Sequence, residues 1–191
     1  TSRNLNLDFC PTETEFYLTS EKREIGKKMI KKDKYNIILG VGSSGPTTKW
    51  GVDNYANLIN KLNINTNYHF YLLCGKNQSD ISNQIINKSI KKNCSSLHNM
   101  SIRKLIPLLA SCNMYVGNDS FGHHITSQSN IPSIVIILDT PKAYTDYSVN
   151  QYRILPEGVS HDEVGHGSNF NPNQISVDTV IGKIKELKKL N

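Results

Sequence analysis

Short apolar runs alternate with amphipathic segments along most of the chain. The runs at residues 35–41, 68–74 and 133–138 have the length and the β-branched or aromatic content of buried strands. Residues 114–116 predict a further, shorter strand. Because these runs are continuously apolar, we expect strands that are covered on both faces.

Between the apolar runs, hydrophobic residues recur at helical spacing. The predicted helices are residues 54–62, 80–90, 102–111, 122–129 and 177–190, with a more polar helix at residues 21–32. Pro107 is expected to kink or shorten the third of them. Residues 139–173 predict a polar loop, and residues 1–20 a linker or edge segment.

Repeated strand–helix–strand units predict an α/β fold, a Rossmann-like parallel sheet with helices on both faces. We expect residues 1–34 to form an N-terminal linker and helical extension, and residues 35–191 to form the Rossmann-like domain. Ligands of such sheets bind beyond the carboxyl ends of the strands. This rule selects the loops at residues 42–50, 75–80 and 117–124.

The run Gly-Val-Gly-Ser-Ser-Gly at residues 40–45 formally matches the dinucleotide-binding pattern G-x-G-x-x-G. In that fingerprint the helix starts within the glycines, so that its N-terminus meets the pyrophosphate. Here the helical pattern starts only near Val52, and Gly75 replaces the acidic ribose ligand after the second strand. Both departures argue against a dehydrogenase. The P-loop pattern fails too, because no Gly-Lys-Ser/Thr sequence follows the glycines.

The loop after the first strand carries two threonine hydroxyls and a cation, on Thr47, Thr48 and Lys49. Hydroxyls, backbone N–H groups and an ammonium group together suit a diphosphate. The alternative is an ordinary surface loop with a solvated Lys49 and with Trp50 anchored in the core. The loop by itself does not decide between the two.

A second candidate loop joins the strand at residues 114–116 to a short helix. A phosphate at that helix N-terminus would be stabilised by backbone N–H groups and by the helix dipole. Asp119 also suits the helix N-cap, and the two roles can coexist. The adjacent His123 and His124 should point to different faces of the helix and cannot both serve one ion, so we predict no metal site.

The net charge of +6 and the pI near 9.1 indicate an acidic partner. Much of the charge lies at residues 21–34 and 183–189, which fit solvated helix faces. Neither stretch is interleaved with aromatic residues, so we predict no nucleic-acid partner. Peripheral contact of these stretches with a membrane remains an option.

The cellular compartment is predicted from the cysteines and from the lack of targeting signals. The four cysteines are widely spaced and form no CxxC pair, which favours a reducing environment. The chain has neither a signal-peptide pattern nor an apolar stretch of about 20 residues. We therefore expect a cytoplasmic protein, peripheral to the inner membrane at most.

Several of these segments, taken in order, resemble the heptosyltransferases of glycosyltransferase family 9. The loop at residues 42–50 resembles the family's diphosphate loop, and residues 100–109 resemble its motif helix. Residues 115–120 resemble its Asp-Ser/Thr-Gly motif, with His124 at the position of the motif histidine. The similarity runs from about residue 35 to residue 141.

The resemblance implies the C-terminal half of a GT-B enzyme with two Rossmann-like domains. This half would bind an ADP-heptose-like nucleotide-sugar donor without a cofactor. The N-terminal half, or a partner chain, would supply the acceptor site and the acidic base for inverting transfer to a lipopolysaccharide-type acceptor. No catalytic residue is therefore assigned within this chain, which we expect to bind the donor but to turn over little or none.

Site residues follow from the resemblance by position. Thr47, Thr48 and Lys49 would contact the diphosphate, Asp119 the sugar, and the backbone from Ser120 to Gly122 the phosphates, with the loop before Asp80 near the nucleoside. The predicted donor site comprises Ser44, Thr47, Thr48, Lys49, Asp80, Asp119, Ser120, Phe121, Gly122 and His124. One departure is that Phe121 occupies the position of the family's glycine, with Gly122 one place later.

Four alternatives stay open at this point, one of which is a Rossmann-like domain that retains no ligand. A uridine donor would make the protein a different GT-B glycosyltransferase or a sugar-nucleotide epimerase. A module that has lost catalysis would only bind a nucleotide-sugar. A basic nucleic-acid-binding domain would show affinity that falls steeply with salt.

Overall fold

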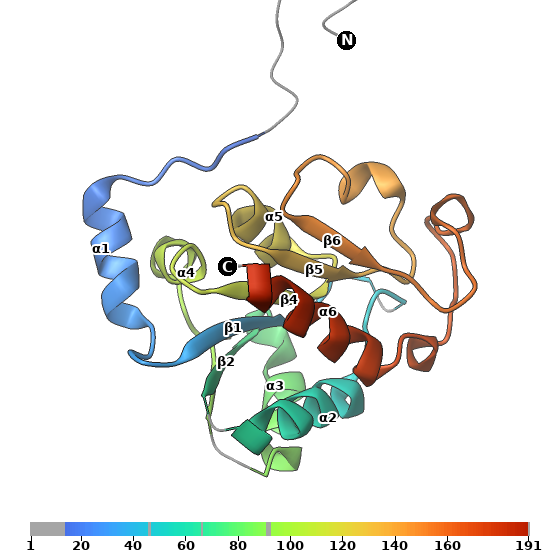
Figure 1. The fold of residues 1–191 in the computed structure, drawn as a ribbon, viewed down its shortest axis with the longest axis horizontal. Helices are drawn as coiled ribbons and strands as arrows, with labels where there is room; N and C mark the ends of the chain where they lie inside the picture. The colour runs from blue at the N-terminus through green and yellow to red at the C-terminus, as the bar shows by residue number, and fades with distance from the viewer. Residues whose placement is uncertain (1–13, 46, 66, 91–92, 191) are drawn as a thin grey trace, which may run out of the picture.

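Six parallel strands form the centre of the fold, in the order β3-β2-β1-β4-β5-β6 (Figure 1). The strands are β1 (Tyr35–Gly40), β2 (Tyr68–Leu73), β3 (Cys94–Ser96), β4 (Met114–Asn118), β5 (Ser133–Ile136) and β6 (Gln151–Ile154). In this computed structural model, residues 14–45, 47–65, 67–90 and 93–190 are described. The predicted parallel sheet is confirmed, because every pair of neighbouring strands is parallel.

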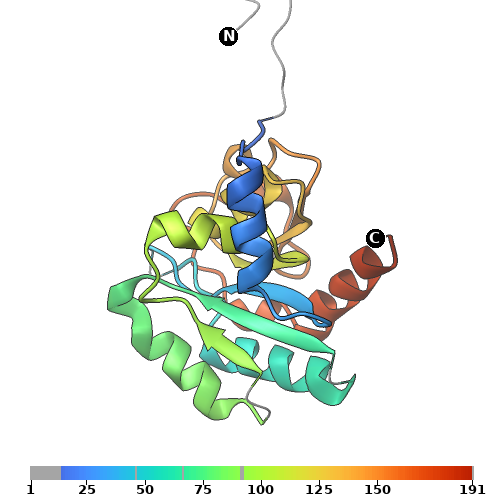
Figure 2. The same cartoon turned by 90° about the vertical axis from the view of Figure 1, so that its left-hand side faces the viewer.

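Helices cover both faces of the sheet, as predicted (Figures 1 and 2). The helices are α1 (Ser20–Met29), α2 (Val52–Leu62), α3 (Ser79–Lys88), α4 (Ile102–Leu109), α5 (Phe121–Ser127) and α6 (Val177–Leu190). Side chains of α2, α3 and α6 share one hydrophobic core with the strands. Side chains of α4 and α5 form the core on the opposite face, where α1 adds Met29.

Burial on both faces explains the continuous apolar strands. Ile37 and Leu39 pack in the first core, whereas Ile38 between them packs in the second, and all three are fully buried. The same alternation separates Val116 from Tyr115 in β4. A strand with cores on both sides has no solvent-facing position, so its sequence shows no polar alternation.

The two edge strands were not predicted. β3 is only three residues long, and β6 lies inside the segment that the sequence analysis expected to be a polar loop. Both strands have a neighbour on one side only, and polar residues such as Ser95 and Arg153 are compatible with that position. They therefore carry no apolar run that would reveal them.

The segment before β1 packs onto the rest of the fold. The Phe16 amide donates to the Gln128 carbonyl at 2.8 Å, and Thr19 caps α1. Gly26 of α1 is buried against α4, since a Cβ atom there would lie 2.0 Å from the Pro107 carbonyl oxygen. Residues 1–13 of the predicted linker, with Cys10 among them, lie outside the described residues, as does Pro46.

Lysine-rich stretches lie on solvated helix surfaces. Lys27 pairs with Glu24 at 2.8 Å on α1, and Lys183 pairs with Glu186 at 2.7 Å on α6. Among the described helices, none has both the length and the apolar character that crossing a membrane requires.

Asn118, at the end of β4, connects three segments through one fully buried side chain. Its Oδ1 accepts from the Trp50 amide at 2.9 Å and lies 3.0 Å from the Tyr55 hydroxyl. Its Nδ2 donates to the Val41 carbonyl at 3.2 Å. The amide therefore fixes the start of α2 and the end of β1 relative to the end of β4.

We expect Asn118→Ala to lower the free energy of unfolding by about 2–4 kcal/mol, because buried polar groups of Trp50 and Val41 lose their partners. Urea unfolding measures this change. Asn83→Ala is the matched control, since Asn83 is exposed on α3 and should leave the stability unchanged or slightly raised. Equal effects of the two substitutions would contradict the role of Asn118.

Candidate functional site

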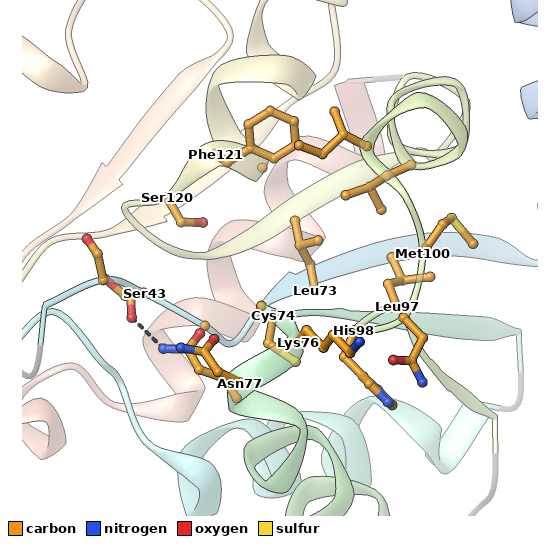
Figure 3. Close-up of a pocket in the computed structure, with 18 of the residues that line it drawn as sticks. Ser43, Leu73, Cys74, Lys76, Asn77, Leu97, His98, Met100, Ser120 and Phe121 are labelled. Carbon is orange, nitrogen blue, oxygen red and sulfur yellow. Dashed lines mark hydrogen bonds between the residues drawn. The ribbon is translucent and has the colours of Figure 1, made fainter.

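A pocket of about 880 Å³ opens at the carboxyl ends of β1, β2, β3 and β4 (Figure 3). The strand order reverses between β1 and β4, and such a switch point is where open α/β sheets bind ligands. The pocket is lined by residues 42–44, 73–78, 97–102 and 120–122, together with Leu105.

The β1 and β2 loops meet at one wall of the pocket. The Gln78 side chain donates to the Ser43 carbonyl at 2.6 Å. A Cβ atom on Gly42 would lie 2.5 Å from the Gln78 Oε1 atom and 2.9 Å from the Cys74 Cα atom. Gly42 therefore allows the two loops to approach closely. As predicted from the sequence, the next helix begins only at Val52.

The turn from β4 into α5 forms the opposite wall. A Cβ atom on Gly122 would lie 2.5 Å from Leu73 and 2.6 Å from the ring of Tyr115, so α5 packs closely on β2 and β4. Phe121 is 43% exposed and lines the pocket. The Tyr115 hydroxyl donates to the Asn118 carbonyl at 2.7 Å and lies 3.1 Å from the Ser120 hydroxyl.

The pocket has two chemically different ends. Ser43 and Ser120 lie at one end, and Leu97 and Met100 lie at the other (Figure 3). Lys76 and the amide side chains of Asn77 and Gln78 line the floor between them. The pocket can therefore hold a ligand with one polar and one flat apolar part.

A second polar cluster lies beside the pocket, beyond the ends of β4 and β5. The Asp119 carboxylate lies 3.2 Å from His123 Nδ1 and 3.9 Å from His124 Nε2. The Thr47 hydroxyl donates to Asp139, and His124 pairs with the Tyr147 hydroxyl. We call Asp119, Asp139, His123, His124 and Tyr147 the acid–histidine cluster.

Burial raises the pKa of Asp119, and the neighbouring Asp139 raises it further. A hydrogen bond from Thr140 and the nearby rings of His124 and His166 act in the opposite direction. Two carboxylates close together repel an anionic group but accept hydrogen bonds from hydroxyl groups. The cluster therefore suits a polyhydroxylated ligand better than a phosphate.

Both histidines of the cluster favour the neutral form. Burial lowers the pKa of His123 to about 3, and the adjacent His124 lowers it further. Burial also lowers the pKa of His124, partly offset by Asp119. His123 Nδ1 accepts a hydrogen bond from the Ser120 amide at 3.2 Å, which ties the cluster to the wall of the pocket.

The sequence-based argument against a metal site, that the adjacent His123 and His124 point to different faces of the helix, is wrong. Asp119, His123 and His124 offer ligand atoms within 4.8 Å of one another, and the two imidazole rings lie 3.8 Å apart between centroids. Adjacent residues meet here because the rings turn toward each other at the start of α5. These three residues could hold a cation, although His123 Nδ1 already accepts from the Ser120 amide.

The predicted site residues divide between the two places. Ser44, Ser120, Phe121 and Gly122 line the pocket. Asp119 and His124 belong to the acid–histidine cluster, and Thr47 donates to it. The Thr48 hydroxyl bonds to Ser43 and to the Gly45 carbonyl, and Lys49 forms no ion pair with any residue that the structure describes. Asp80 is exposed in the first turn of α3 and does not line the pocket.

Sequence reasoning did not assign residues 97–102, Asp139 or Thr140 to the site, although residues 100–109 resemble the family's motif helix. Residues 97–102 follow β3, and an unrecognised strand hides the loop at its carboxyl end. Asp139 and Thr140 lie in the loop that begins after β5, three and four residues beyond its end, so the strand-end rule could have selected them. Trp50 is fully buried, and its indole donates to the Ile175 carbonyl at 2.9 Å. A Trp50 anchored in the core is what the surface-loop interpretation of residues 42–50 expected.

The sheet order, the helices on both faces and the pocket at the switch point define a Rossmann-like α/β domain of the GT-B type. Residues 1–169 match the protein family described as glycosyltransferase family 9 (heptosyltransferase). The chain therefore belongs to glycosyltransferase family 9.

Known relatives agree with this assignment. Lipopolysaccharide heptosyltransferase 1 of Campylobacter coli is 26% identical over 201 residues, which cover 98% of this chain and 58% of the relative. Among solved structures, E. coli ADP-heptose lipopolysaccharide heptosyltransferase II superposes with a TM-score of 0.75 at 19% identity, covering 93% of this chain and 54% of that chain. A family 9 glycosyltransferase from Veillonella parvula superposes with a TM-score of 0.78 at 16% identity, covering 97% of this chain and 56% of that chain. This chain thus spans little more than half the length of these relatives.

Stability should fall as the pH drops below about 6.5, where an unfolded histidine gains its proton. Burial lowers the pKa of His123 to about 3 and that of His69 to about 4, with Lys31 and Lys34 contributing at His69. At a pH between the pKa of an unfolded histidine and the lowered pKa of the folded one, the unfolded chain binds more protons than the folded chain. Each histidine therefore removes up to about 1.4 kcal/mol per pH unit.

Urea unfolding at about pH 7 and about pH 5 measures this loss. His69→Gln removes the contribution of His69 and should make the pH dependence shallower. The Asp119 carboxylate raises the pKa of His124, so Asp119→Asn should lower that pKa further and make the pH dependence steeper. A stability that is constant over this range would contradict the buried neutral histidines.

Proposed function

We propose that this chain is the donor-binding domain of a heptosyltransferase-type glycosyltransferase. It holds an ADP-sugar by its diphosphate for inverting transfer of the sugar to a lipopolysaccharide-type acceptor. The observation that carries the proposal is the juxtaposition of a two-ended pocket with the acid–histidine cluster at the switch point of the sheet.

The pocket suits the nucleoside and the diphosphate. The apolar side chains of Leu97 and Met100 provide a surface for a flat base, and the amides of Asn77 and Gln78 offer hydrogen bonds to a ribose. The opposite end, with Ser44 and the turn at residues 120–122, presents hydroxyl and backbone groups to the phosphates.

Lys49 provides the positive charge for the diphosphate in this proposal. It lies in the β1–α2 loop with Thr47 and Thr48, and no ion pair with a described residue competes for its ammonium group. During glycosyl transfer, negative charge develops on the departing diphosphate. A positioned cation and fixed hydrogen-bond donors stabilise that charge more in the transition state than in the bound substrate.

The acid–histidine cluster suits the sugar. Asp119 and Asp139 accept hydrogen bonds from hydroxyl groups, and a neutral His124 accepts or donates one. The Ser120 amide connects this cluster to the phosphate end of the pocket through His123. A sugar attached to the diphosphate would therefore lie over Asp119 and His124.

The reaction requires groups that the proposal places outside this chain. The acceptor hydroxyl attacks the anomeric carbon, the bond to the diphosphate oxygen breaks with inversion, and a base takes the hydroxyl proton. We assign that base and the acceptor site to an N-terminal domain or a partner chain, in keeping with the share of the relatives' length that this chain spans. The lysine-rich faces of α1 and α6 suit contact with an anionic membrane surface.

Two solved neighbours support an adenosine donor. E. coli heptosyltransferase WaaC was solved with ADP and with ADP-2-deoxy-2-fluoro heptose, and these structures match with TM-scores of 0.72 and 0.69 at 14% and 13% identity. A UDP-GlcNAc 2-epimerase from Neisseria meningitidis bound to UDP-GlcNAc matches with a TM-score of 0.53 at 15% identity. The uridine alternative therefore enters the binding experiment as a competing ligand.

Calorimetric titration of the purified chain with ADP, UDP and an ADP-sugar tests the proposal. We expect ADP to bind more tightly than UDP. Lys49→Ala should weaken ADP binding about tenfold, through the loss of a charge-assisted hydrogen bond. Asp119→Asn should weaken binding of the ADP-sugar but leave that of ADP unchanged, because Asp119 contacts only the sugar.

Lys61→Ala is the matched control for Lys49→Ala. Lys61 lies on α2 and pairs with Asp178 at 2.7 Å, outside the pocket, so its loss should not change ADP affinity. Preference for UDP would keep the fold and change the donor. No binding of any of the three ligands would overturn the proposed function.

A further inference from the structure

His98 projects a hydrogen-bonding ring into the pocket from the segment that follows β3. It is half-buried and lies next to Leu97 in the pocket lining, close to Lys76 (Figure 3). Its Nδ1 atom lies 2.8 Å from the Ser96 hydroxyl oxygen. None of the described residues bonds to its other nitrogen, Nε2, which is therefore available to a ligand.

A chain of serine hydroxyls fixes which nitrogen of His98 carries the proton. Ser82 is fully buried, and its hydroxyl donates to the Ser79 carbonyl at 2.8 Å. The Ser96 hydroxyl in turn donates to the Ser82 oxygen at 2.8 Å. Each hydroxyl has one hydrogen, so the Ser96 oxygen can only accept from His98. The neutral ring therefore carries its proton on Nδ1.

Because the proton is on Nδ1, Nε2 presents a lone pair to the pocket. We propose that His98 selects the base of the donor nucleotide, with Nε2 accepting a hydrogen bond from an exocyclic amino group. Ser96 is the positioning residue that holds the required tautomer. This inference rests on the proposed function, since it assumes that the pocket binds a nucleoside diphosphate.

The position of His98 favours the base over the phosphates. It lies in the same segment as Leu97 and Met100, at the end of the pocket away from Ser43 and Ser120 (Figure 3). Adenine carries an amino group that donates to a lone pair, whereas uracil carries a carbonyl oxygen at the corresponding ring position. An acceptor facing an acceptor leaves both groups unsatisfied, and sites built around a hydrogen bond discriminate strongly against such ligands.

Calorimetry with ADP and with the diphosphate of purine riboside, which lacks only the amino group, tests the assignment. We expect the unsubstituted chain to prefer ADP by about tenfold, the effect of about one hydrogen bond on the affinity. His98→Leu should bind the two ligands equally. His98→Gln should regain part of the preference, because its amide oxygen reaches a position similar to that of Nε2.

The tautomer is tested separately by long-range proton–nitrogen NMR spectra of the histidine rings. We expect His98 to carry its proton on Nδ1, and Ser96→Ala to produce a mixture of tautomers with a smaller preference for ADP. Ser95→Ala is the matched control, because Ser95 lies in the same strand but contacts His69 at 3.0 Å instead. Ser95→Ala should change neither the tautomer of His98 nor the preference for ADP.

Each outcome decides the inference. Equal binding of ADP and of the purine riboside diphosphate to the unsubstituted chain overturns the role of His98 while leaving the proposed function intact. A proton on Nε2 overturns it as well. Failure of both nucleotides to bind overturns the proposed function together with this inference.

Discussion

The buried amide of Asn118 is the constraint on which the rest of the site depends. It is fully buried at the end of β4, and it forms hydrogen bonds with Val41 and Trp50. Val41 is the first residue of the loop between β1 and α2, and Trp50 lies near the end of that loop. The two loops with the predicted ligand residues leave the sheet on either side of this amide. A buried polar group must be satisfied, so the loops cannot move apart without a large cost in free energy. The site is therefore held by the core and not by the ligand.

This constraint explains how a small domain presents two chemically different surfaces next to each other. The pocket lies over the ends of β1 to β4, and the acid–histidine cluster lies beside it, over the ends of β4 and β5. The turn at Ser120 separates them and belongs to both, through its place in the pocket wall and its amide bond to His123. A ligand that spans the two surfaces has a nucleoside at one end, a sugar at the other and a diphosphate between them. That order of chemical groups is the basis of the proposed donor.

Much of the fold could be predicted because most strands are buried on both faces and stand out as apolar runs. β3 and β6 could not, since edge strands keep polar residues and β3 contains only three. Because β3 was not recognised, His98 and the rest of residues 97–102, about a third of the residues that line the pocket, were missed as well. The metal argument failed for a different reason. Helical spacing places adjacent side chains about 100° apart, but it does not describe how two imidazole rings turn at the first turn of a short helix.

The most direct test of the account is an NMR titration of the chain with ADP, followed through the backbone amides. The account predicts that the largest shifts fall in residues 42–49, 75–78, 97–102 and 119–122, the loops at the carboxyl ends of β1 to β4. Amides of α1 and α6 should remain unchanged, because the lysines of these helices lie on solvated surfaces. Shifts confined to those lysine-rich helices would mean that ADP binds only as a general anion, and would contradict the donor-binding site.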